Sequence, residues 1–341
     1  MTYTVTLQPD AQQFTVNDDE SLLDAATRHG IQLEYGCRDG RCGSCQCTVL
    51  EGEIEYPDGR PARIDDEQEA NGAVLICKAH AKSDLVVKAR VLEGFANLPI
   101  KKLPCRIAHI KQVCHDVMQL QLKIPESQRM QYLAGQYIEF LLSNGHHRAF
   151  SIANAPHNDE YIELHIRHVP DGEFSEYIFN EAKEKAMLRI MGPLGTFVLR
   201  EDSPRPIILM AGGTGFAPIK GIVEHALYNG IDRPIHIYRG VRAKRDLYMH
   251  ELPEKWAAEN DHITYTPVLS DPIPEDNWNG KTGYVHNIIV EDFPDMSDLD
   301  VYAGGPPQMV YAGLDLFSEH GLPREQYFSD AFEYAKDEDD S

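Results

Sequence analysis

The feature that most constrains this sequence is the uneven placement of its cysteines. Four of the seven fall within eleven residues, a fifth follows after a gap, and two lie further along: Cys37, Cys42, Cys45, Cys47, then Cys77, then Cys105 and Cys114. The N-terminus has neither the basic start nor the apolar stretch of a secretory signal, so we expect a cytoplasmic protein. In that reducing compartment such clustering indicates metal or redox chemistry rather than a disulfide scaffold.

The spacing Cys37-x4-Cys42-x2-Cys45, followed by Cys77 after 31 residues, matches the plant-type [2Fe–2S] pattern. Three neighbouring thiolates can wrap one loop around two irons, while the fourth comes from a distant segment. Structural zinc and unpaired buried thiols are the alternatives. Zinc usually recruits two close Cys pairs or Cys with His, and neither Cys37 nor Cys77 has such a partner. The pattern therefore favours the cluster.

Glycines interleave with these cysteines, at positions 36, 40 and 43. Residues without a Cβ let the backbone approach closely, so that amide N–H groups can point at the sulfur atoms. We expect the remaining thiols to be inert packed residues: Cys47, Cys105 and Cys114.

Charge and hydropathy exclude two classes of partner. The chain carries 32 Lys and Arg against 54 Asp and Glu, a formal charge of −22, which disfavours nucleic-acid binding. Its longest apolar runs, such as Ile207–Ala211, are far too short to span a bilayer, so we expect no membrane association. Apolar residues still amount to 42%, enough for packed cores.

The chain of 341 residues divides into three stretches of different pattern. Residues 1–95 read as short strands with one early helix capped by Ser21, and the segment 95–104 reads as a linker. Residues 96–200 contain several short strands between turn signals, as in a small antiparallel barrel. Residues 201–341 alternate buried strands with helices, as in a doubly wound parallel sheet, and end in an acidic tail that we expect to be disordered (Asp337 to Asp340).

The middle stretch carries two candidate flavin motifs. In the first, Arg148, Phe150 and Ser151 follow a strand and a turn. The ring can stack on an isoalloxazine, the guanidinium can pair with a pyrophosphate, and the hydroxyl can reach the N5 region. An ordinary strand end is the alternative interpretation.

The second motif runs from Gly172 to Ser175 and precedes a helical stretch that we expect to follow Ser175. The open N–H groups and the dipole of a helix N-terminus would accept the same pyrophosphate. A simple helix cap at Ser175 is the alternative.

In the last stretch, the strand Ile207–Ala211 leads through a glycine-rich turn to a helix expected near Pro218. That turn consists of Gly212, Gly213, Thr214 and Gly215. Strand, turn and helix N-terminus form a cradle for the phosphates of a dinucleotide, although the full G-x-G-x-x-G pattern is missing.

Charged residues at the next strand ends bear on which dinucleotide binds. Four basic residues lie at or after the end of the second strand, and they either hold a 2′-phosphate or form a solvated charged turn. They are Arg239, Arg242, Lys244 and Arg245. Asp271, at the following strand end, would repel a 2′-phosphate, so we expect NADH rather than NADPH.

The order of these motifs, ending in Gly304-Gly305-Pro306-Pro307, resembles the ferredoxin–NADP reductase-like oxidoreductases that carry an N-terminal plant-type ferredoxin. These include the reductase components of methane, phenol and toluene monooxygenases and CDP-6-deoxy-3,4-glucoseen reductase. The runs LAGQYIEF, HRAFSIANAP and FSDAF are similar to the last branch, and the resemblance covers residues 1–335. It implies a multidomain α+β and α/β chain with a β-grasp-like [2Fe–2S] domain, an FAD barrel and an NAD domain.

The resemblance also implies roles for single residues. The four cysteines of the spaced pattern correspond to the cluster ligands, and Ser175 to the pyrophosphate-binding serine. Phe150 replaces the usual Tyr of the flavin motif. Phe332 falls where a C-terminal aromatic often covers the flavin. Gly304 replaces the family's Cys beside the nicotinamide, so that Ser151 and Gly304 are the residues expected next to the reacting atoms.

The function implied is transfer of electrons from NADH through FAD and the cluster to a partner protein. An oxygenase or a pyridoxamine-phosphate-dependent deoxysugar dehydrase would be the acceptor. Residues 1–95 hold nine Lys and Arg against 17 Asp and Glu, which favours a basic docking face on that acceptor. The alternatives are a carrier or redox-sensing module with little turnover and a free flavin or quinone reductase.

Overall fold

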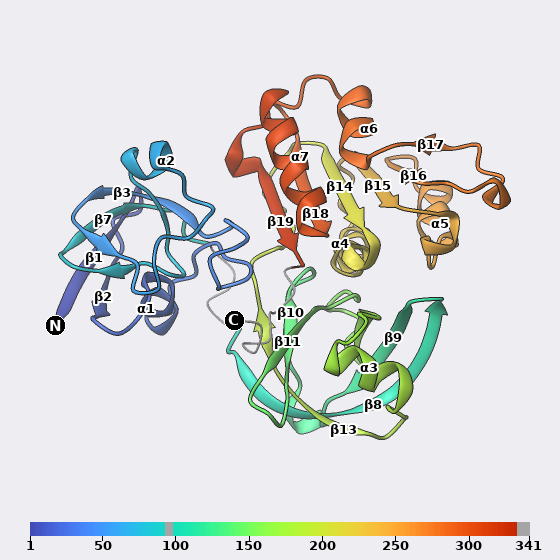
Figure 1. The fold of residues 1–341 in the computed structure, drawn as a ribbon, viewed down its shortest axis with the longest axis horizontal. Helices are drawn as coiled ribbons and strands as arrows, with labels where there is room; N and C mark the ends of the chain where they lie inside the picture. Colours follow the sequence, from blue (N-terminus) through green and yellow to red (C-terminus); the bar gives the residue numbers. More distant parts are fainter. Residues whose placement is uncertain (93–97, 333–341) are drawn as a thin grey trace. The chain divides into compact units, whose positions relative to one another are not determined.

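The computed structural model describes residues 1–92 and 98–332 in two compact units, Met1–Pro99 and Ile100–Ser341 (Figure 1). The predicted first domain falls in unit 1. The predicted third domain and residues 100–200 of the predicted second domain fall in unit 2, and the domain boundaries stay a prediction. The acidic tail expected at Asp337 to Asp340 lies outside the described residues.

Unit 1 is built on a five-stranded sheet in the order β2-β1-β7-β3-β5, in which β1 and β7 pair in parallel and the other neighbours are antiparallel. The strands are β1 (Thr2–Gln8), β2 (Gln13–Asn17), β3 (Gln46–Glu51), β5 (Ala73–Leu75) and β7 (Leu85–Lys88). Smaller elements are β4 (Ile54–Glu55), β6 (His80–Ala81), α1 (Leu22–Arg28) and α2 (Asp66–Ala70). This is the β-grasp-like architecture that the sequence predicts.

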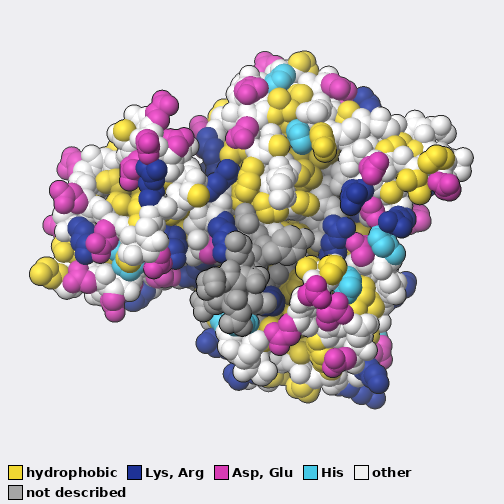
Figure 2. Space-filling view, viewed as in Figure 1, with side chains coloured by type: hydrophobic (Ala, Val, Ile, Leu, Met, Phe, Trp, Pro, Cys, Tyr) yellow, Lys and Arg dark blue, Asp and Glu magenta, His cyan; other side chains and the backbone are white. Residues whose placement is uncertain are grey.

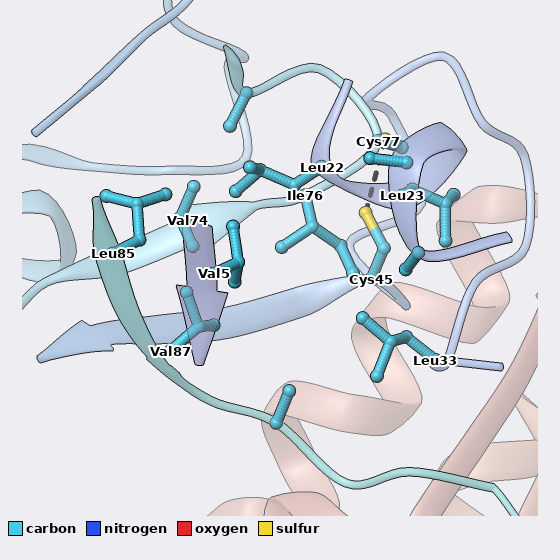
Figure 3. Packing of buried hydrophobic residues seen from close by; sticks show 14 of the residues in the cluster. Val5, Leu22, Leu23, Leu33, Cys45, Val74, Ile76, Cys77, Leu85 and Val87 are labelled. Carbon is cyan, nitrogen blue, oxygen red and sulfur yellow. Dashed lines mark hydrogen bonds between the residues drawn. The ribbon is translucent and has the colours of Figure 1, made fainter. Parts of the chain in front are cut away.

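The core of unit 1 follows from simple alternation. Alternate residues of the strands, such as Val5 and Leu7 or Leu85 and Val87, are buried, because successive side chains point to opposite faces (Figure 3). Ser21 caps α1 as expected, since its side chain accepts from the N–H of Asp24 at 3.1 Å.

The first half of unit 2 is an antiparallel barrel of six strands in the order β11-β10-β13-β8-β9-β12. They are β8 (Lys101–Cys114), β9 (Val117–Lys123), β10 (Tyr137–Leu141), β11 (His147–Ser151), β12 (Ile162–Arg167) and β13 (Met187–Leu194). A bridge between Ile152 and Leu164 joins the outer strands. The predicted linker is wrong over Lys101–Pro104: these residues belong to β8, because Leu103 and Cys105 turn into the core.

The barrel helix α3 (Glu173–Asn180) also departs from expectation. Its N-cap is Gly172, so Ser175 lies in the first turn rather than ahead of the helix. The buried side chains of Phe174 and Ile178 fix this register, since they lie four residues apart on one face.

The second half of unit 2 is an all-parallel sheet in the order β17-β16-β15-β14-β18-β19. Its strands are β14 (Ile207–Gly212), β15 (Ile235–Val241), β16 (Ile263–Leu269), β17 (Lys281–Thr282), β18 (Asp300–Gly305) and β19 (Tyr327–Ala331). The helices are α4 (Phe216–Tyr228), α5 (Glu251–Glu259), α6 (Val285–Asp292) and α7 (Pro307–Glu319). This is the predicted doubly wound sheet.

The chain order reverses between β14 and β18, which makes their carboxyl ends the topological switch point, where such folds bind ligands. Helix α4 begins at Phe216, two residues before the expected start, directly after a tight turn over Gly213–Gly215. Among the described residues, no helix is both long and apolar enough to cross a bilayer.

Candidate functional site

The four cysteines of the spaced pattern come together in unit 1. The N–H of Cys37 donates to Sγ of Cys42 at 3.4 Å, and the N–H of Cys42 donates to Sγ of Cys37 at 3.3 Å. The Sγ atoms of Cys45 and Cys77 are 3.2 Å apart, at one end of the apolar core (Figure 3). A loop and a remote segment thus bring four thiols to one place, although they are up to 40 residues apart in the chain.

Close packing explains the glycines of this loop. A Cβ on Gly36 would lie 3.2 Å from Sγ of Cys42, so a side chain there would press on a thiol. Gly40 and Gly43 have φ angles of +84° and +75°, the left-handed region that favours glycine. The backbone can therefore turn sharply enough to aim N–H groups at sulfur.

Hydrogen bonding between the paired thiols lowers the pKa of one member of each pair, Cys42 and Cys77, and raises that of its partner, Cys37 and Cys45. The Cys37 thiol and the N–H groups of Cys37 and Ser44 lower the pKa of Cys42 to about 6. Burial raises the pKa of Cys47 and of Cys105 to about 12, so these two thiols stay protonated and unreactive at neutral pH. A set of four converging thiols with amide donors fits an iron–sulfur cluster.

In unit 2, strand β11 carries the first flavin motif and ends at Ser151. Its Oγ donates to Oδ2 of Asp330 at 2.6 Å, across 179 residues of sequence. Asp330 lies in β19, so this bond joins the barrel to the parallel sheet. The sequence interpretation did not single out Asp330; its only signal was the run FSDAF.

The neighbours of Ser151 in β11 are half-buried. The Phe150 ring packs against Phe140 and Phe174, with ring centroids 5.7 and 5.5 Å apart. The guanidinium of Arg148 donates from Nη1 to the carbonyl of His147 at 3.0 Å.

The second flavin motif forms the N-terminus of helix α3. Gly172 has no side chain to cap the first turn. The Ser175 hydroxyl donates to the carbonyl of Val169 at 2.9 Å and accepts from its N–H at 3.1 Å. The serine therefore ties the preceding loop to the helix.

The glycine-rich turn after β14 lies against the end of β18, backbone on backbone. A Cβ on Gly215 would lie 2.0 Å from the carbonyl oxygen of Gly304, and a Cβ on Gly304 would lie 3.0 Å from that of Gly215. The N–H of Phe332 donates to the carbonyl of Gly305 at 2.9 Å. The structure thus brings together Gly304, Phe332 and the turn, which are far apart in the sequence.

A cavity of about 490 Å³ opens at these strand ends. Its walls come from the turn (Gly212–Thr214), from β15 (Gly240–Arg242), from the segment Tyr284–His286, and from Asp116 and Arg167 of the barrel. Arg167 reaches the turn itself, because its Nη1 lies 3.2 Å from the position of a Cβ on Gly213. The sequence interpretation missed Arg167, which lies at the end of β12, five residues before the second flavin motif.

Two of the basic residues expected near a 2′-phosphate, Arg239 and Arg242, lie in different environments in the structure. The interpretation of Arg239 as a phosphate ligand or a solvated residue is wrong: it is fully buried, with its guanidinium 4.1 and 4.4 Å from the ring centres of Phe216 and Tyr248. Arg242 does line the cavity, and its Nη2 lies 3.9 Å from Oδ2 of Asp271.

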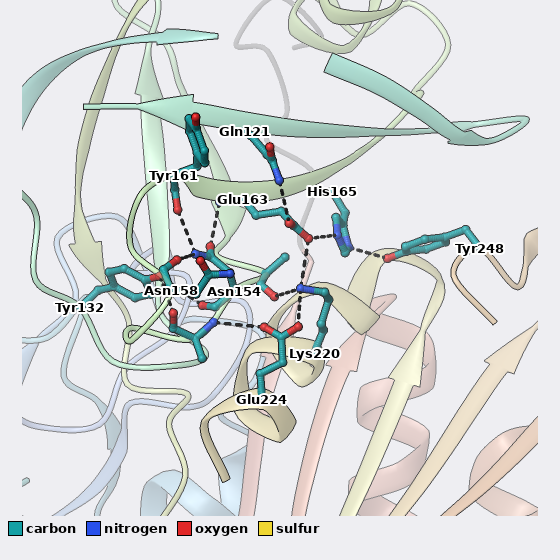
Figure 4. Close-up of polar contacts among 12 residues, drawn as sticks. Gln121, Tyr132, Asn154, Asn158, Tyr161, Glu163, His165, Lys220, Glu224 and Tyr248 are labelled. Carbon is teal, nitrogen blue, oxygen red and sulfur yellow. Dashed lines mark hydrogen bonds and ion pairs between the residues drawn. The ribbon is translucent and has the colours of Figure 1, made fainter. Parts of the chain in front are cut away.

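Behind the cavity, a buried polar network joins the barrel to the parallel sheet (Figure 4). His165 Nε2 lies 3.1 Å from Oε1 of Glu163, and His165 Nδ1 lies 3.0 Å from the Tyr248 hydroxyl. Burial lowers the pKa of His165, so the ring is neutral. Both contacts are then satisfied when Nε2–H donates to Glu163 and Nδ1 accepts from Tyr248.

Lys220 of α4 adds the cation of this network. Burial alone would raise the pKa of the Glu163 carboxyl, but the hydrogen bond from His165 and the Lys220 ammonium outweigh it and hold that pKa well below its usual range. None of these residues was singled out from the sequence, because Lys220 and Tyr248 lie far along the chain from Glu163 and His165.

Family models match all three parts of the chain. A 2Fe-2S iron-sulfur cluster binding domain covers residues 5–82, an oxidoreductase FAD-binding domain 104–199 and an oxidoreductase NAD-binding domain 209–313. The "CDP-6-deoxy-L-threo-D-glycero-4-hexulose-3-dehydrase reductase" of Yersinia pseudotuberculosis is 41% identical over 97% of this chain and 99% of its own. The chain belongs to the ferredoxin–NADP reductase-like oxidoreductases with an N-terminal [2Fe–2S] domain. It is thus an oxidoreductase that uses a [2Fe–2S] cluster, FAD and a nicotinamide dinucleotide to supply electrons to a partner.

Other relatives of this reductase serve different systems. The "Phenol hydroxylase P5 protein" of Acinetobacter pittii is 30% identical over 99% of this chain and 96% of its own. Among solved structures, the Amycolatopsis cytochrome P450 reductase GcoB is 28% identical, with a TM-score of 0.76 and coverage of 97% and 98%. The ferredoxin reductase in carbazole 1,9a-dioxygenase is 27% identical, with a TM-score of 0.69 and coverage of 98% and 99%.

Proposed function

We propose that this reductase takes electrons from NADH and delivers them through its flavin and its cluster to a sugar-nucleotide dehydrase. The cavity at the switch point, lined by the glycine-rich turn that packs against Gly304, is the observation that carries the proposal. When bound, the flavin accepts a hydride as an electron pair and the cluster passes electrons singly. The chain's own residues hold and orient these groups.

The thiols of Cys37, Cys42, Cys45 and Cys77 would hold the cluster. Amide N–H groups of the loop already point at two of these sulfurs, which lowers the cost of gathering negative charge there.

On the flavin side, Ser151 and Phe150 would orient the isoalloxazine, Arg148 and Ser175 its pyrophosphate. Ser151 is well placed to hold a hydrogen bond near the reacting atoms, because Asp330 fixes its hydroxyl from the opposite sheet. Gly304, at the end of β18, would border the nicotinamide ring. Phe332 borders the same strand end.

At the dinucleotide cavity, Gly212–Gly215 and Arg167 would bind phosphates. Asp271, which is exposed beside Arg242, would repel a 2′-phosphate, and this favours NADH. Comparing kcat/KM for NADH and NADPH tests this choice directly.

The acceptor's docking face is proposed to be basic. Around the cluster loop, three ion pairs each expose the acid more than the base: Asp24 with Arg38, Asp58 with Lys78 and Asp66 with Arg60. Asp66, for example, is 94% exposed against 38% for Arg60. Acidic and basic side chains lie beside one another over the surface of unit 1 (Figure 2). A basic partner surface would meet the outer carboxylates first.

The dehydrase is proposed over an oxygenase because the relative named for it is 41% identical, against 30% for the phenol hydroxylase component. Neither a carrier or redox-sensing module nor a free flavin or quinone reductase fits as well. A carrier without turnover needs no dinucleotide cavity, and a free flavin reductase needs no four converging thiols.

Capture of proteins on the reduced, immobilised reductase tests the acceptor. We expect a sugar-nucleotide dehydrase that is reduced when NADH is added, with binding weakened by salt. Reduction of an oxygenase component instead would contradict the choice of acceptor.

A further inference from the structure

One face of helix α4 makes polar and aromatic contacts with the barrel. Lys220, Gly221, Glu224 and Tyr228 follow the helical repeat and all contact barrel segments. A Cβ on Gly221 would lie 3.3 Å from the carbonyl oxygens of Ile152 and Asn154. The Tyr228 ring stacks on His157 with centroids 3.9 Å apart.

Lys220 makes the ionic contacts of this face (Figure 4). Its ammonium lies 3.2 Å from the carbonyl oxygen of Ala153, 3.2 Å from Oε1 of Glu163 and 2.8 Å from Oε1 of Glu224. The side chain is 9% exposed. Glu224 in turn accepts from the N–H of Ala155 at 3.4 Å. One buried cation therefore binds two strand segments of the barrel to the helix.

The segments joined by these contacts lie close in sequence to the flavin-side Ser151 and to the nucleotide turn Gly212–Gly215. Ala153 lies two residues after Ser151, and α4 begins directly after the turn Gly212–Gly215. The position of the nucleotide turn relative to the end of β11 thus depends on how α4 sits on segment 152–157. A shift of about 1 Å between donor and acceptor can slow a reaction a hundredfold.

We propose that Lys220 is a positioning residue for hydride transfer, fixing the nucleotide turn against the flavin-side strand end through Glu163 and Glu224. The inference rests on the proposed function, in which these two regions bind nicotinamide and flavin.

Stability alone does not explain such a network. Removing two charges from water is costly, and an apolar replacement of a buried ion pair is often neutral or stabilising. The ions make the contact directional: the ammonium has three donors and finds three oxygen acceptors, one on α4 and one on each of two barrel segments. An apolar contact would allow the helix to slide.

The test compares the holoenzyme with Lys220→Met and with the double variant Lys220→Met/Glu163→Gln, which leaves fewer charges unpaired. A matched control is Asp300→Asn. It breaks another buried ion pair of the same unit, Arg233 Nη2 to Asp300 Oδ2 at 2.6 Å, at the amino ends of the strands and therefore away from the cavity. Rapid-mixing absorbance gives the flavin reduction rate, and titration with NAD⁺ gives its Kd.

We expect both Lys220 variants to lower the flavin reduction rate at saturating NADH at least tenfold, with the Kd for NAD⁺ changed less than threefold. Amide exchange should also accelerate in segments 151–155 and 213–220. Asp300→Asn should lose thermal stability but keep the wild-type reduction rate.

An unchanged rate in the Lys220 variants, or equal slowing in Asp300→Asn, would overturn the inference. If wild-type flavin is not reduced by NADH at all, the proposed function fails instead, so the two failures are distinguishable.

Discussion

The two sites of this reductase are built in opposite ways. The cluster loop of unit 1 gathers three of its four thiols from nine consecutive residues, and each thiol is a candidate metal ligand. The cofactor region of unit 2 instead joins elements from across the chain, as in the bond between Ser151 and Asp330. Loss of one metal ligand should therefore abolish the first site, whereas loss of one contact should weaken the second by degrees.

The largest effect is expected for Cys77→Ser. Changes next to a metal ligand commonly cost ten- to a hundredfold, so loss of a ligand should lower NADH-dependent cytochrome c reduction by at least about a hundredfold. Ferricyanide, which can accept electrons from a flavin, should still be reduced. Both assays and the cluster absorbance check this.

Cys47→Ala is the control for that loss, because Cys47 belongs to the same unit and its thiol stays protonated. Equal loss of cluster absorbance in both variants would remove the distinction between ligand and packed thiol.

A graded effect is expected for Ser151→Ala, which removes a hydroxyl held by Asp330. The flavin reduction rate should fall by about ten- to a hundredfold, because an oriented hydrogen bond at the reacting atoms is lost. Cluster absorbance should not change. Asp330→Asn should cost less, and the double variant little more than Ser151→Ala alone. Wild-type rates in a stopped-flow measurement of Ser151→Ala would refute the role.

A smaller effect is expected at the rim of the cavity. Asp271→Ala removes an exposed negative charge beside Arg242, so kcat/KM for NADPH should rise about fivefold while that for NADH stays nearly constant. Steady-state kinetics with both dinucleotides decide the matter. An equal gain for both would show that Asp271 does not discriminate between them.

The smallest effect concerns pH. Since the pKa of folded Glu163 is held far below its usual range, the unfolded chain takes up a proton first as the pH falls below about 4.3. Stability is therefore complete above that pH and is lost as the pH drops: about 1 kcal/mol between pH 6 and pH 3.5. Urea unfolding of wild type and Glu163→Gln should show this loss only in wild type. Parallel curves would contradict it.

The cluster site could be predicted from the sequence better than the cofactor region of unit 2, because three of its four cysteines lie close together in the chain. The spacing of Cys37, Cys42, Cys45 and Cys77 is a local pattern. Alternation of buried strands and helices indicates the parallel sheet of unit 2, whereas the β-grasp-like fold of unit 1 was implied by the family resemblance. Asp330 and Lys220 could not be found that way, because Ser151 lies 179 residues from Asp330, and the barrel partners of Lys220, Glu163 and Ala153, lie 57 and 67 residues from it. Arg239 was misjudged for a related reason: a charged residue at a strand end gives no sign in the sequence of the two rings that enclose it.

The central claim is that NADH reduces a flavin and then a [2Fe–2S] cluster bound to the four cysteines. Anaerobic titration of the purified protein with NADH, followed by absorbance and electron paramagnetic resonance, tests it most directly. We predict that the flavin bands bleach and that the signal of a reduced two-iron cluster appears, with one electron for the cluster beyond the two for the flavin. Bleaching of the flavin with no cluster signal, in protein shown to contain iron and sulfide, would contradict the account.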